Sequence, residues 1–515
     1  SGYKNTAMAL AELVDNSFDA NSTNVQIIFI EKKKKGRLRV DEIYVIDDGI
    51  GMSSKVVENC LGFGASGDDE AHVKNKKRIG KYGVGLSQAS QSQCQRFEVF
   101  SWQDGKSYHQ YFDRNCEKFR ESRRVNQWNP AQEIDIPSEM KEFILDYDQK
   151  SGTAIRWSNC DLLSHVTSEA NIRHCEKILG QVYRYKIESG ECKISFTTLT
   201  RNENEQLVEQ GSSTGPLAFD PLFLMQNTST SRDLISASIA AENLKVREHY
   251  QKYIISENEC MPTSELLKEH TTTSTFSWGD IDIKYSFKTS VATLDIMKPG
   301  VRNGGEQLIG KIYEKKINSG NICFVRSGRE IESGTFGQFY KISVPENRFW
   351  TIEIEFDNEA DAIMGLANNK LSYNFEQRLT SKGYDQYEAT LIEAREELHY
   401  QISNQIMAAA KAALKRIKEI NSGWEQKNLI STAEEDGAGL GQTPETGDAI
   451  HIDPKGRRVD ALDDNEEKEL YNLIKGKHPD ASDESIWKRI RHIDDTGTRT
   501  YIMYNTIPHS EQLWV

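Results

Sequence analysis

Residues 12–20 read Glu-Leu-Val-Asp-Asn-Ser-Phe-Asp-Ala, and this segment gives the strongest indication of the fold of the first part of the chain. Apolar residues around it recur three and four positions apart, at Ala7, Leu10, Ala11, Val14 and Phe18. This spacing predicts an amphipathic helix with an apolar back. Glu12 and Asn16 stand one turn apart on its polar front, where a carboxylate could polarise water and an amide oxygen could bind Mg²⁺. A solvated polar face explains the segment equally well.

A second motif follows a predicted hairpin. Two β-branched runs, Asn24 to Ile30 and Ile43 to Ile46, flank a Lys-rich segment, which is typical of a hairpin over a core. The second run stops at residues 47–52, which read Asp-Asp-Gly-Ile-Gly-Met. Asp47 is therefore expected at a strand end, next to Gly49 and Gly51, which let a flat ligand approach the backbone. A plain turn explains Asp-Asp-Gly alone.

Two further motifs are rich in glycine. Residues 79–86 read Ile-Gly-Lys-Tyr-Gly-Val-Gly-Leu where a helix is predicted to begin, and its free N–H groups could bind phosphates. Glycines also serve tight turns, so this motif alone is weak evidence. Residues 151–153, Ser-Gly-Thr, open a predicted strand. The stretch from Ser54 to Gly85 is rich in Gly, Asp and Lys, and we expect a long mobile loop ending in a helix start.

Taken together and in this order, the four segments resemble the ExxxN, DxGxG, GxxGxG and GT motifs of the GHKL superfamily, which includes gyrase, heat-shock chaperones, histidine kinases and MutL. The resemblance covers roughly residues 1–200. It implies a Bergerat-type ATP-binding domain of the α/β class, an α+β sandwich, with a flexible lid. ATP and Mg²⁺ are the cofactors that it implies.

The resemblance also assigns roles by position. Glu12 becomes the general base, Asn16 the Mg²⁺ ligand, Asp47 the acceptor of the adenine amino group, and Thr153 its hydrogen-bonding helper. The other predicted nucleotide-binding residues shape the pocket and the phosphate loop, and they are Gly49, Gly51, Met52, Gly80, Lys81, Tyr82, Gly83, Val84, Gly85 and Leu86. Asp15 and Asp19 are expected to support the helix.

The strand and helix patterns predict five segments. Strand-like runs Phe97–Trp102, Thr153–Trp157 and Lys193–Leu199 complete a mixed sheet with helices on one face. New strands at Ile322–Val325 and Thr351–Phe356 predict a second α/β domain. The expected organisation is an ATP-binding domain at 1–225, a second domain at 226–382, a long amphipathic helix at 383–422, an acidic Gly-rich linker at 423–455 and a small C-terminal segment at 456–515.

Two segments resemble MORC-type and related bacterial GHKL ATPases. Residues 60–66, Cys-Leu-Gly-Phe-Gly-Ala-Ser, resemble their lid, and residues 368–375, Asn-Asn-Lys-Leu-Ser-Tyr-Asn-Phe, resemble the loop of their ribosomal-S5-like transducer. The resemblance implies that Lys370 reaches the γ-phosphate, although a solvated loop lysine is the alternative. The chain departs from MORC proteins in lacking a cysteine cluster for a CW zinc finger and in having Ser87 where a lysine often stands. Histone-tail recognition is therefore not expected.

Composition narrows the class of protein. The chain has 515 residues, enough for about three domains. A formal charge of −14 neither requires nor excludes contact with nucleic acid. Eight cysteines are scattered without a CxxC pair, and there is no apolar run long enough to span a bilayer. We expect reduced thiols, no membrane contact and a cytoplasmic protein, or a nuclear one if the source is eukaryotic.

The favoured interpretation is an Mg²⁺-dependent ATPase whose nucleotide closes the lid and drives homodimerisation. By resemblance to MutL and MORC proteins, the resulting clamp acts on DNA or on an effector protein, and a bacterial defence system is one setting. The alternative is an ATP-dependent chaperone of the heat-shock type, because residues 79–86 also resemble the chaperone lid. A histidine kinase would place this domain near its C-terminus, and a topoisomerase would need cleavage machinery.

Overall fold

The computed structural model describes two compact units, residues 1–428 and 429–515. The described residues are 3, 5–61, 85–115, 130–144, 151–213, 215–240, 247, 250–293, 321–336, 339–340, 345–364, 386–437, 468, 471–472, 475–476, 483, 491–493 and 499–501. Within these residues, no helix combines the length and apolar character needed to cross a bilayer. The cysteines among them are all free.

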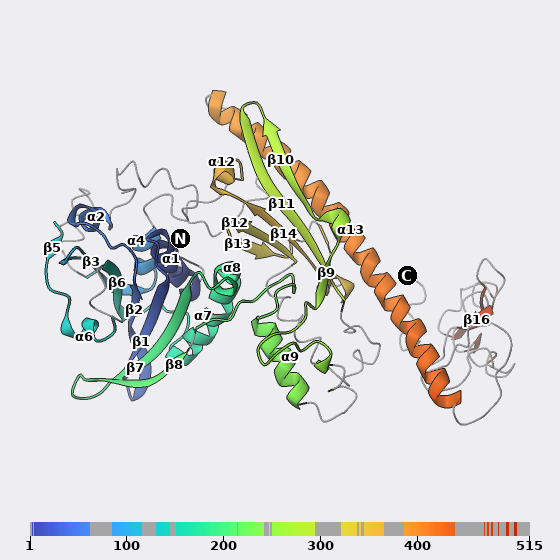
Figure 1. The fold of residues 1–515 in the computed structure, drawn as a ribbon, viewed down its shortest axis with the longest axis horizontal. Coiled ribbons are helices and arrows are strands. Elements are labelled where there is room, and N and C mark those ends of the chain that lie inside the picture. Colours follow the sequence, from blue (N-terminus) through green and yellow to red (C-terminus); the bar gives the residue numbers. More distant parts are fainter. Residues whose placement is uncertain are drawn as a thin grey trace. The chain divides into compact units, whose positions relative to one another are not determined.

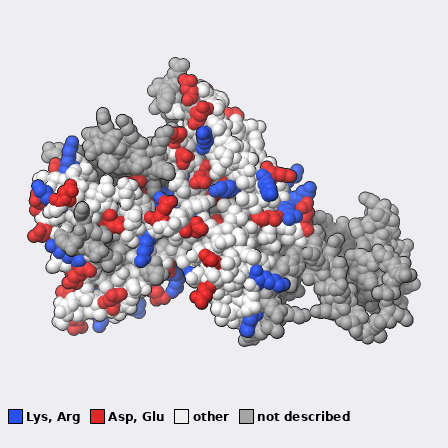
Figure 2. Space-filling model, in the orientation of Figure 1, with Lys and Arg blue, Asp and Glu red and all other residues white. Residues whose placement is uncertain are grey.

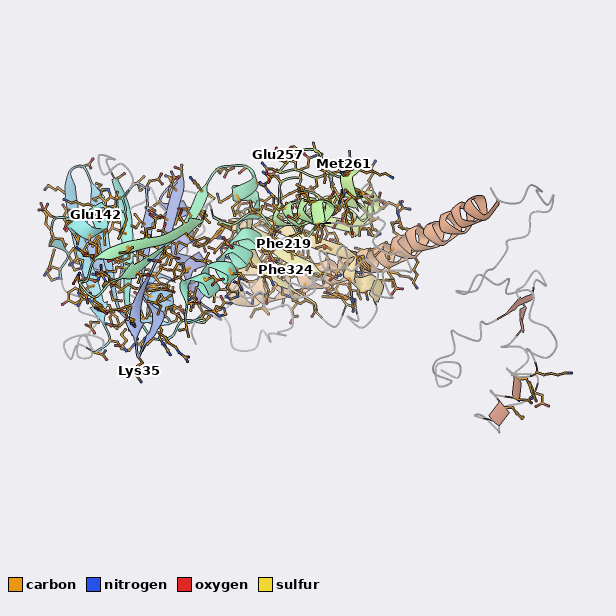
Figure 3. The ribbon with its side chains drawn as sticks, turned by 90° about the horizontal axis from the view of Figure 1, so that it is seen from below. Lys35, Glu142, Phe219, Glu257, Met261 and Phe324 are labelled. Atoms are coloured by element: carbon orange, nitrogen blue, oxygen red, sulfur yellow. The ribbon has the colours of Figure 1, made fainter. Side chains whose placement is uncertain are left out.

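An eight-stranded sheet organises the first lobe of the larger unit (Figure 1). Its strands, in spatial order, are β5 (Gln132–Glu133), β4 (Lys106–Asp113), β3 (Cys94–Gln103), β6 (Ser151–Cys160), β2 (Arg37–Asp47), β1 (Asn24–Lys34), β7 (Lys193–Arg201) and β8 (Leu207–Ser213). Only β1 and β7 pair in parallel. Strands β1 and β2 form the predicted hairpin, whose turn is made by Lys35 and Gly36 at positive φ. Lys35 lies at the hairpin tip (Figure 3).

Helices cover one face of this sheet. They are α1 (Thr6–Asp19), α4 (Gly85–Gln91), α7 (Ser168–Val182) and α8 (Arg184–Glu188). Alternate strand residues such as Ile27 and Phe29 pack under α1, because successive side chains point to opposite faces. Asn5 caps α1 by accepting a hydrogen bond from the Met8 N–H at 2.9 Å. The opposite face carries the short helix α6 (Ser138–Lys141), where Met140 packs with Tyr44 and others.

The predicted loop from Ser54 to Gly85 is wrong at its start, because Ser54–Asn59 form helix α2. Val57 is the buried residue of this helix. With a single buried apolar residue, the helix has no apolar periodicity strong enough to be predicted from the sequence. The predicted helix start at the end of this stretch is confirmed, since α4 begins at Gly85. Residues 62–84 lie outside the described part of the chain.

A six-stranded sheet organises the second lobe. Its strands are β9 (Ser264–Leu266), β10 (Thr272–Trp278), β11 (Ile281–Ala292), β12 (Ile322–Arg326), β13 (Arg329–Gly334) and β14 (Trp350–Phe356). The path runs β10-β11-β14-β12-β13, with β9 beside β11. Helix α9 (Ser229–Ala240), helix α12 (Asp361–Met364) and the 3₁₀ turns η1 (Lys268–His270), η4 (Pro345–Arg348) and η5 (Asn358–Ala360) complete it. Both strands predicted from residues 322–325 and 351–356 are present.

Helix α13 spans Gln386–Gly437. Ala394, Leu398, Ile402 and Ile406 pack into the core of the second lobe, as their three-and-four spacing requires. The helix does not stop at residues 421–423, so the predicted start of the linker at residue 423 is wrong. One glycine in a helix interior costs about 1 kcal/mol relative to alanine, which does not end a helix by itself. The smaller unit contains the strand pair β15 (Arg491–Ile493) and β16 (Arg499–Tyr501).

Candidate active site

The polar front of α1 carries Glu12 and Asn16. Glu12 is 5% exposed, and Asn16 is half-buried one turn later. The Glu12 carboxylate lies against the backbone of Gly85 at the start of α4, since a Cβ added at residue 85 would stand 1.7 Å from Oε1. A side chain at residue 85 would therefore force the Glu12 carboxylate to move. The first and third motifs therefore meet in the structure, where the Glu12 carboxylate lies next to Gly85, the first residue of α4.

Asp47 ends β2 with its carboxylate inside the protein. The Ser17 hydroxyl donates to Oδ2 at 2.9 Å, and the Gly49 N–H donates to Oδ1 at 3.0 Å. Burial raises the pKa of Asp47 to about 6, while the hydrogen bonds from Gly49 and Ser17 act in the opposite direction. Because Ser17 lies on α1, this contact ties the second motif to the helix of the first.

Thr153 pairs with Asp47 across β2 and β6, so the fourth motif lies beside the second. Ser101 on β3 pairs with Thr153 from the other side and is fully buried. Its hydroxyl accepts from the Met52 N–H at 2.8 Å and donates to the Gly152 carbonyl at 3.0 Å. The Thr153 hydroxyl, 3.0 Å away, must then donate to Ser101, which leaves the Thr153 oxygen able to accept another donor.

Sequence reasoning missed Ser101. It belongs to none of the four motifs, and its place depends on the register of β3 against β6. No local pattern around residue 101 indicates a polar role, because its neighbours Phe100 and Trp102 continue an ordinary apolar strand. The hydroxyl nevertheless links Met52 of the second motif to Gly152 and Thr153 of the fourth motif.

The glycines of the second motif pack against protein atoms. Gly51 has φ +70°, and a Cβ there would stand 2.3 Å from the Trp102 carbonyl oxygen. A Cβ on Gly49 would approach Ala20 to 2.9 Å, and Ile50 donates to the Ala20 carbonyl. These contacts hold the loop between the end of α1 and the end of β3. Glycine at positions 49 and 51 thus permits close backbone packing in this loop.

Asp48, next to Asp47, has a different function. Its carboxylate accepts hydrogen bonds from Ser22, Thr23 and Asn24 at the start of β1. Burial acts to raise the pKa of Asp48, but these hydrogen bonds, led by Asn24, hold it below its ordinary value. Of these two adjacent aspartates, Asp47 is therefore the buried candidate site residue and Asp48 has a structural role.

Several predicted site residues lie outside the described part of the chain, namely Gly80, Lys81, Tyr82, Gly83, Val84 and Lys370. Met52 and Leu86 are both half-buried and pack against the core beneath α1. Ser87, at the position where a lysine often stands in MORC proteins, is buried and donates to the Leu61 carbonyl at 2.8 Å. A serine at this position thus ties α4 to the segment after α2.

Binding of a metal ion at this site would depend mainly on oxygen atoms supplied by the substrate. Among the described residues, no group of three or more His, Cys, Asp or Glu side chains could hold an ion. Mg²⁺ commonly keeps several waters and takes one or two protein oxygens plus substrate phosphates. The half-buried amide of Asn16, one turn from Glu12, fits that donor set.

Comparisons with known proteins match a family over the part of the chain that contains most of this site. Residues 3–147 match the family described as "Histidine kinase-, DNA gyrase B-, and HSP90-like ATPase". Over 78 residues the chain is 32% identical to "Protein MICRORCHIDIA 6" of Arabidopsis thaliana, a segment that is 15% of this chain and 11% of that protein. A solved structure, "Crystal Structure of N terminal domain of a DNA repair protein", matches with 14% identity, 78% of this chain, 95% of that chain and a TM-score of 0.35.

The matched range contains three of the four motifs, with Glu12, Asn16, Asp47 and Gly85 at the positions their pattern requires. The mixed sheet with helices on one face agrees with the architecture that the motifs predicted. Residues 3–147 therefore match the GHKL-type ATPase family, and a 78-residue segment of the chain resembles the microrchidia (MORC) proteins.

Proposed function

We propose that the chain binds ATP with Mg²⁺ and hydrolyses it to ADP and phosphate. The observation that carries this proposal is the convergence of Glu12, Asp47, Gly85 and Thr153 around the front of α1. Each supplies a different requirement of nucleotide hydrolysis: a base for water, an acceptor for adenine, a backbone donor near phosphate, and a polar helper.

Glu12 is the general base of the proposed reaction. Its carboxylate is almost fully buried beside the start of α4, where it can accept a proton from a water aimed at the terminal phosphate. Asn16 would hold Mg²⁺ through its amide oxygen, and the bound ion would neutralise charge on the phosphates. Both groups are one helical turn apart on the same rigid helix, so their relative position is fixed before substrate arrives.

Asp47 selects adenine in this proposal. Its carboxylate accepts from Ser17 and Gly49 and retains capacity for one more donor, and the adenine amino group is such a donor. Guanine carries a carbonyl at the same ring position, which a carboxylate repels. ATP should therefore bind more tightly than GTP.

The proposed output is a clamp. ATP closes the lid that residues 60–66 resemble, the second domain acts as an S5-like transducer that sends Lys370 to the γ-phosphate, and two copies associate. In this proposal the partner is DNA or an effector protein and the setting is a bacterial defence system. The 32% identity to a microrchidia protein over 78 residues supports only the MORC likeness on which the proposal rests. Figure 2 shows acidic and basic side chains interspersed over the described surface on this face, so a DNA contact would need local basic segments.

The test is a Glu12→Gln variant of the whole chain. It should bind a fluorescent ATP analogue as the wild type does and release phosphate about 10²-fold more slowly or worse, because it lacks the base. Glu58→Gln, an exposed residue on α2, is the matched control and should hydrolyse normally. Wild-type turnover in Glu12→Gln would remove Glu12 from this role, and no turnover in the wild type would overturn the proposed activity.

A further inference from the structure

A buried ion pair joins the second lobe to the helix that carries Glu12. The Nε atom of Arg329, at the start of β13, lies 2.8 Å from Oδ1 of Asp15 on α1. Both side chains are completely inaccessible to solvent. The two residues are 314 positions apart in the chain. Asp15 lies three residues after Glu12, so this contact reaches the helix within one turn of the proposed base.

The backbone around Arg329 fixes where its guanidinium lies. Ser327 and Gly328, with φ of 49° and 77°, form the tight turn between β12 and β13. A bulge follows, because Phe324 pairs with Glu332 while Val325 pairs with Glu330, which leaves Ile331 as the extra residue. Bulges near sites commonly change the direction of side chains. Arg329 and Glu330 are both buried, although they are neighbours in a strand.

Glu330 makes the second half of the same contact. Arg184 on α8 pairs with Glu330 and with Glu353 on β14, and Gln181 donates to Glu330 at 2.6 Å. The β12–β13 hairpin thus contributes the cation Arg329 to a contact with α1. It also contributes the anion Glu330 to contacts with α7 and α8. These pairs dock the two lobes through charges that are buried on both sides. Phe324, on the first strand of the hairpin, is labelled in Figure 3.

Tyr183 contacts the same carboxylate oxygen of Asp15 as Arg329 does. Its hydroxyl lies 2.7 Å from Oδ1 of Asp15 and 2.6 Å from the carbonyl of Ala11 on the same helix. Burial acts to lower the pKa of Arg329, yet Asp15, Tyr183 and also Glu12 raise it, so the guanidinium field extends to the proposed base. Helix α1 is therefore held at Ala11 and Asp15, on either side of Glu12 in the chain.

We propose that Arg329 is a positioning residue, through which the second lobe holds α1 and with it Glu12 in the geometry that hydrolysis needs. This inference rests on the proposed ATPase activity. Two charges buried in one pair are weak as a source of stability, since apolar replacements are often no worse. The effect of this ion pair on the position of Glu12 matters more than its effect on stability, because a displacement of about 1 Å at a reacting group can slow a reaction about 10²-fold.

The experiment compares two paired variants of the full chain. Asp15→Asn with Arg329→Met removes both charges of the α1 contact, so neither partner is left as an unpaired buried ion. Arg326→Met with Asp361→Asn is the matched control: it removes an equally buried pair, bonded at 2.6 and 2.8 Å, from the same hairpin but inside the second lobe. KM and kcat for ATP are measured for each, with analogue affinity.

The α1 pair variant should fold, bind the ATP analogue within about threefold of wild type and lose about tenfold or more in kcat at little changed KM. The control should keep wild-type kcat. A third variant, Arg329→Lys, keeps the charge without the fork and should recover part of the rate. Wild-type kcat in the α1 pair variant, or an equal loss in the control, would overturn the positioning role. Glu12→Gln at wild-type rate would instead count against the proposed reaction itself.

Discussion

Asp47→Asn should weaken nucleotide binding without preventing folding, because asparagine can keep the hydrogen bonds that the carboxylate makes with Gly49 and Ser17. Oδ1 would still accept from the Gly49 N–H. The new amide would donate to the Ser17 hydroxyl oxygen, while that hydroxyl turns to the Leu13 carbonyl, already 3.2 Å away. What changes is the third direction, where an acceptor for the adenine amino group becomes a donor. Adenine nucleotides should lose a hydrogen bond to a charged group, worth about 1.5–3 kcal/mol, and so bind about ten- to a hundredfold more weakly.

The same substitution should stabilise the nucleotide-free protein. The pKa of Asp47 rises from 3.8 to about 6 on folding because of burial, so ionisation opposes folding by about 3 kcal/mol above pH 6. The sign follows from a raised folded pKa: the favourable contribution of Asp47 is present below pH 3.8 and is lost as pH rises through about 6. The asparagine side chain does not ionise and has no such loss, so the advantage of the variant should grow with pH over this window.

Urea unfolding of the nucleotide-free chain, at several pH values between about 4 and 7.5, measures this difference in unfolding free energy. Asp48→Asn is the control, because hydrogen bonds hold the pKa of Asp48 low, which has the opposite sign. Its carboxylate stabilises the fold above pH 3.8, so its removal should destabilise at neutral pH and spare ATP affinity. A pH-independent difference between Asp47→Asn and wild type, or undiminished ATP binding, would refute the reasoning.

Three further outcomes are expected. Asn16→Ala should weaken ATP binding in Mg²⁺ but not in EDTA, as measured by calorimetry, and equal loss in both would contradict the ligand assignment. Gly51→Ala should lower the unfolding free energy by about 1–3 kcal/mol, since its Cβ would stand 2.3 Å from the Trp102 carbonyl. Gly105→Ala is its control, with φ +75° but open space, and should cost less in the same urea titration. Lys370→Ala should spare ADP affinity yet reduce hydrolysis and analogue-induced dimerisation in sedimentation, whereas wild-type behaviour would leave it a solvated lysine.

The local helices and strands could be predicted because the apolar residues of each recur with the period of that type of element. The helix of Glu12 and Asn16, the β1–β2 hairpin and the start of α4 at Gly85 all follow from spacing and turn residues within about a dozen positions. Where the local signal was weak, prediction was wrong: α2 has one buried apolar residue, and α13 passes through a single glycine. Propensities of about 1 kcal/mol are too small to settle such cases.

The amino-acid sequence alone predicts the residues of the nucleotide site, and it also predicts that Asp47 ends a strand, which the structure confirms. Only the tertiary structure decided that Ser101 joins the second and fourth motifs, since that depends on strand register across β3 and β6. It likewise decided that Asp15 meets Arg329, a residue 314 positions away. Local sequence sets the dihedral preferences and the apolar period of each element, whereas contacts between elements are fixed by how their buried faces pack together.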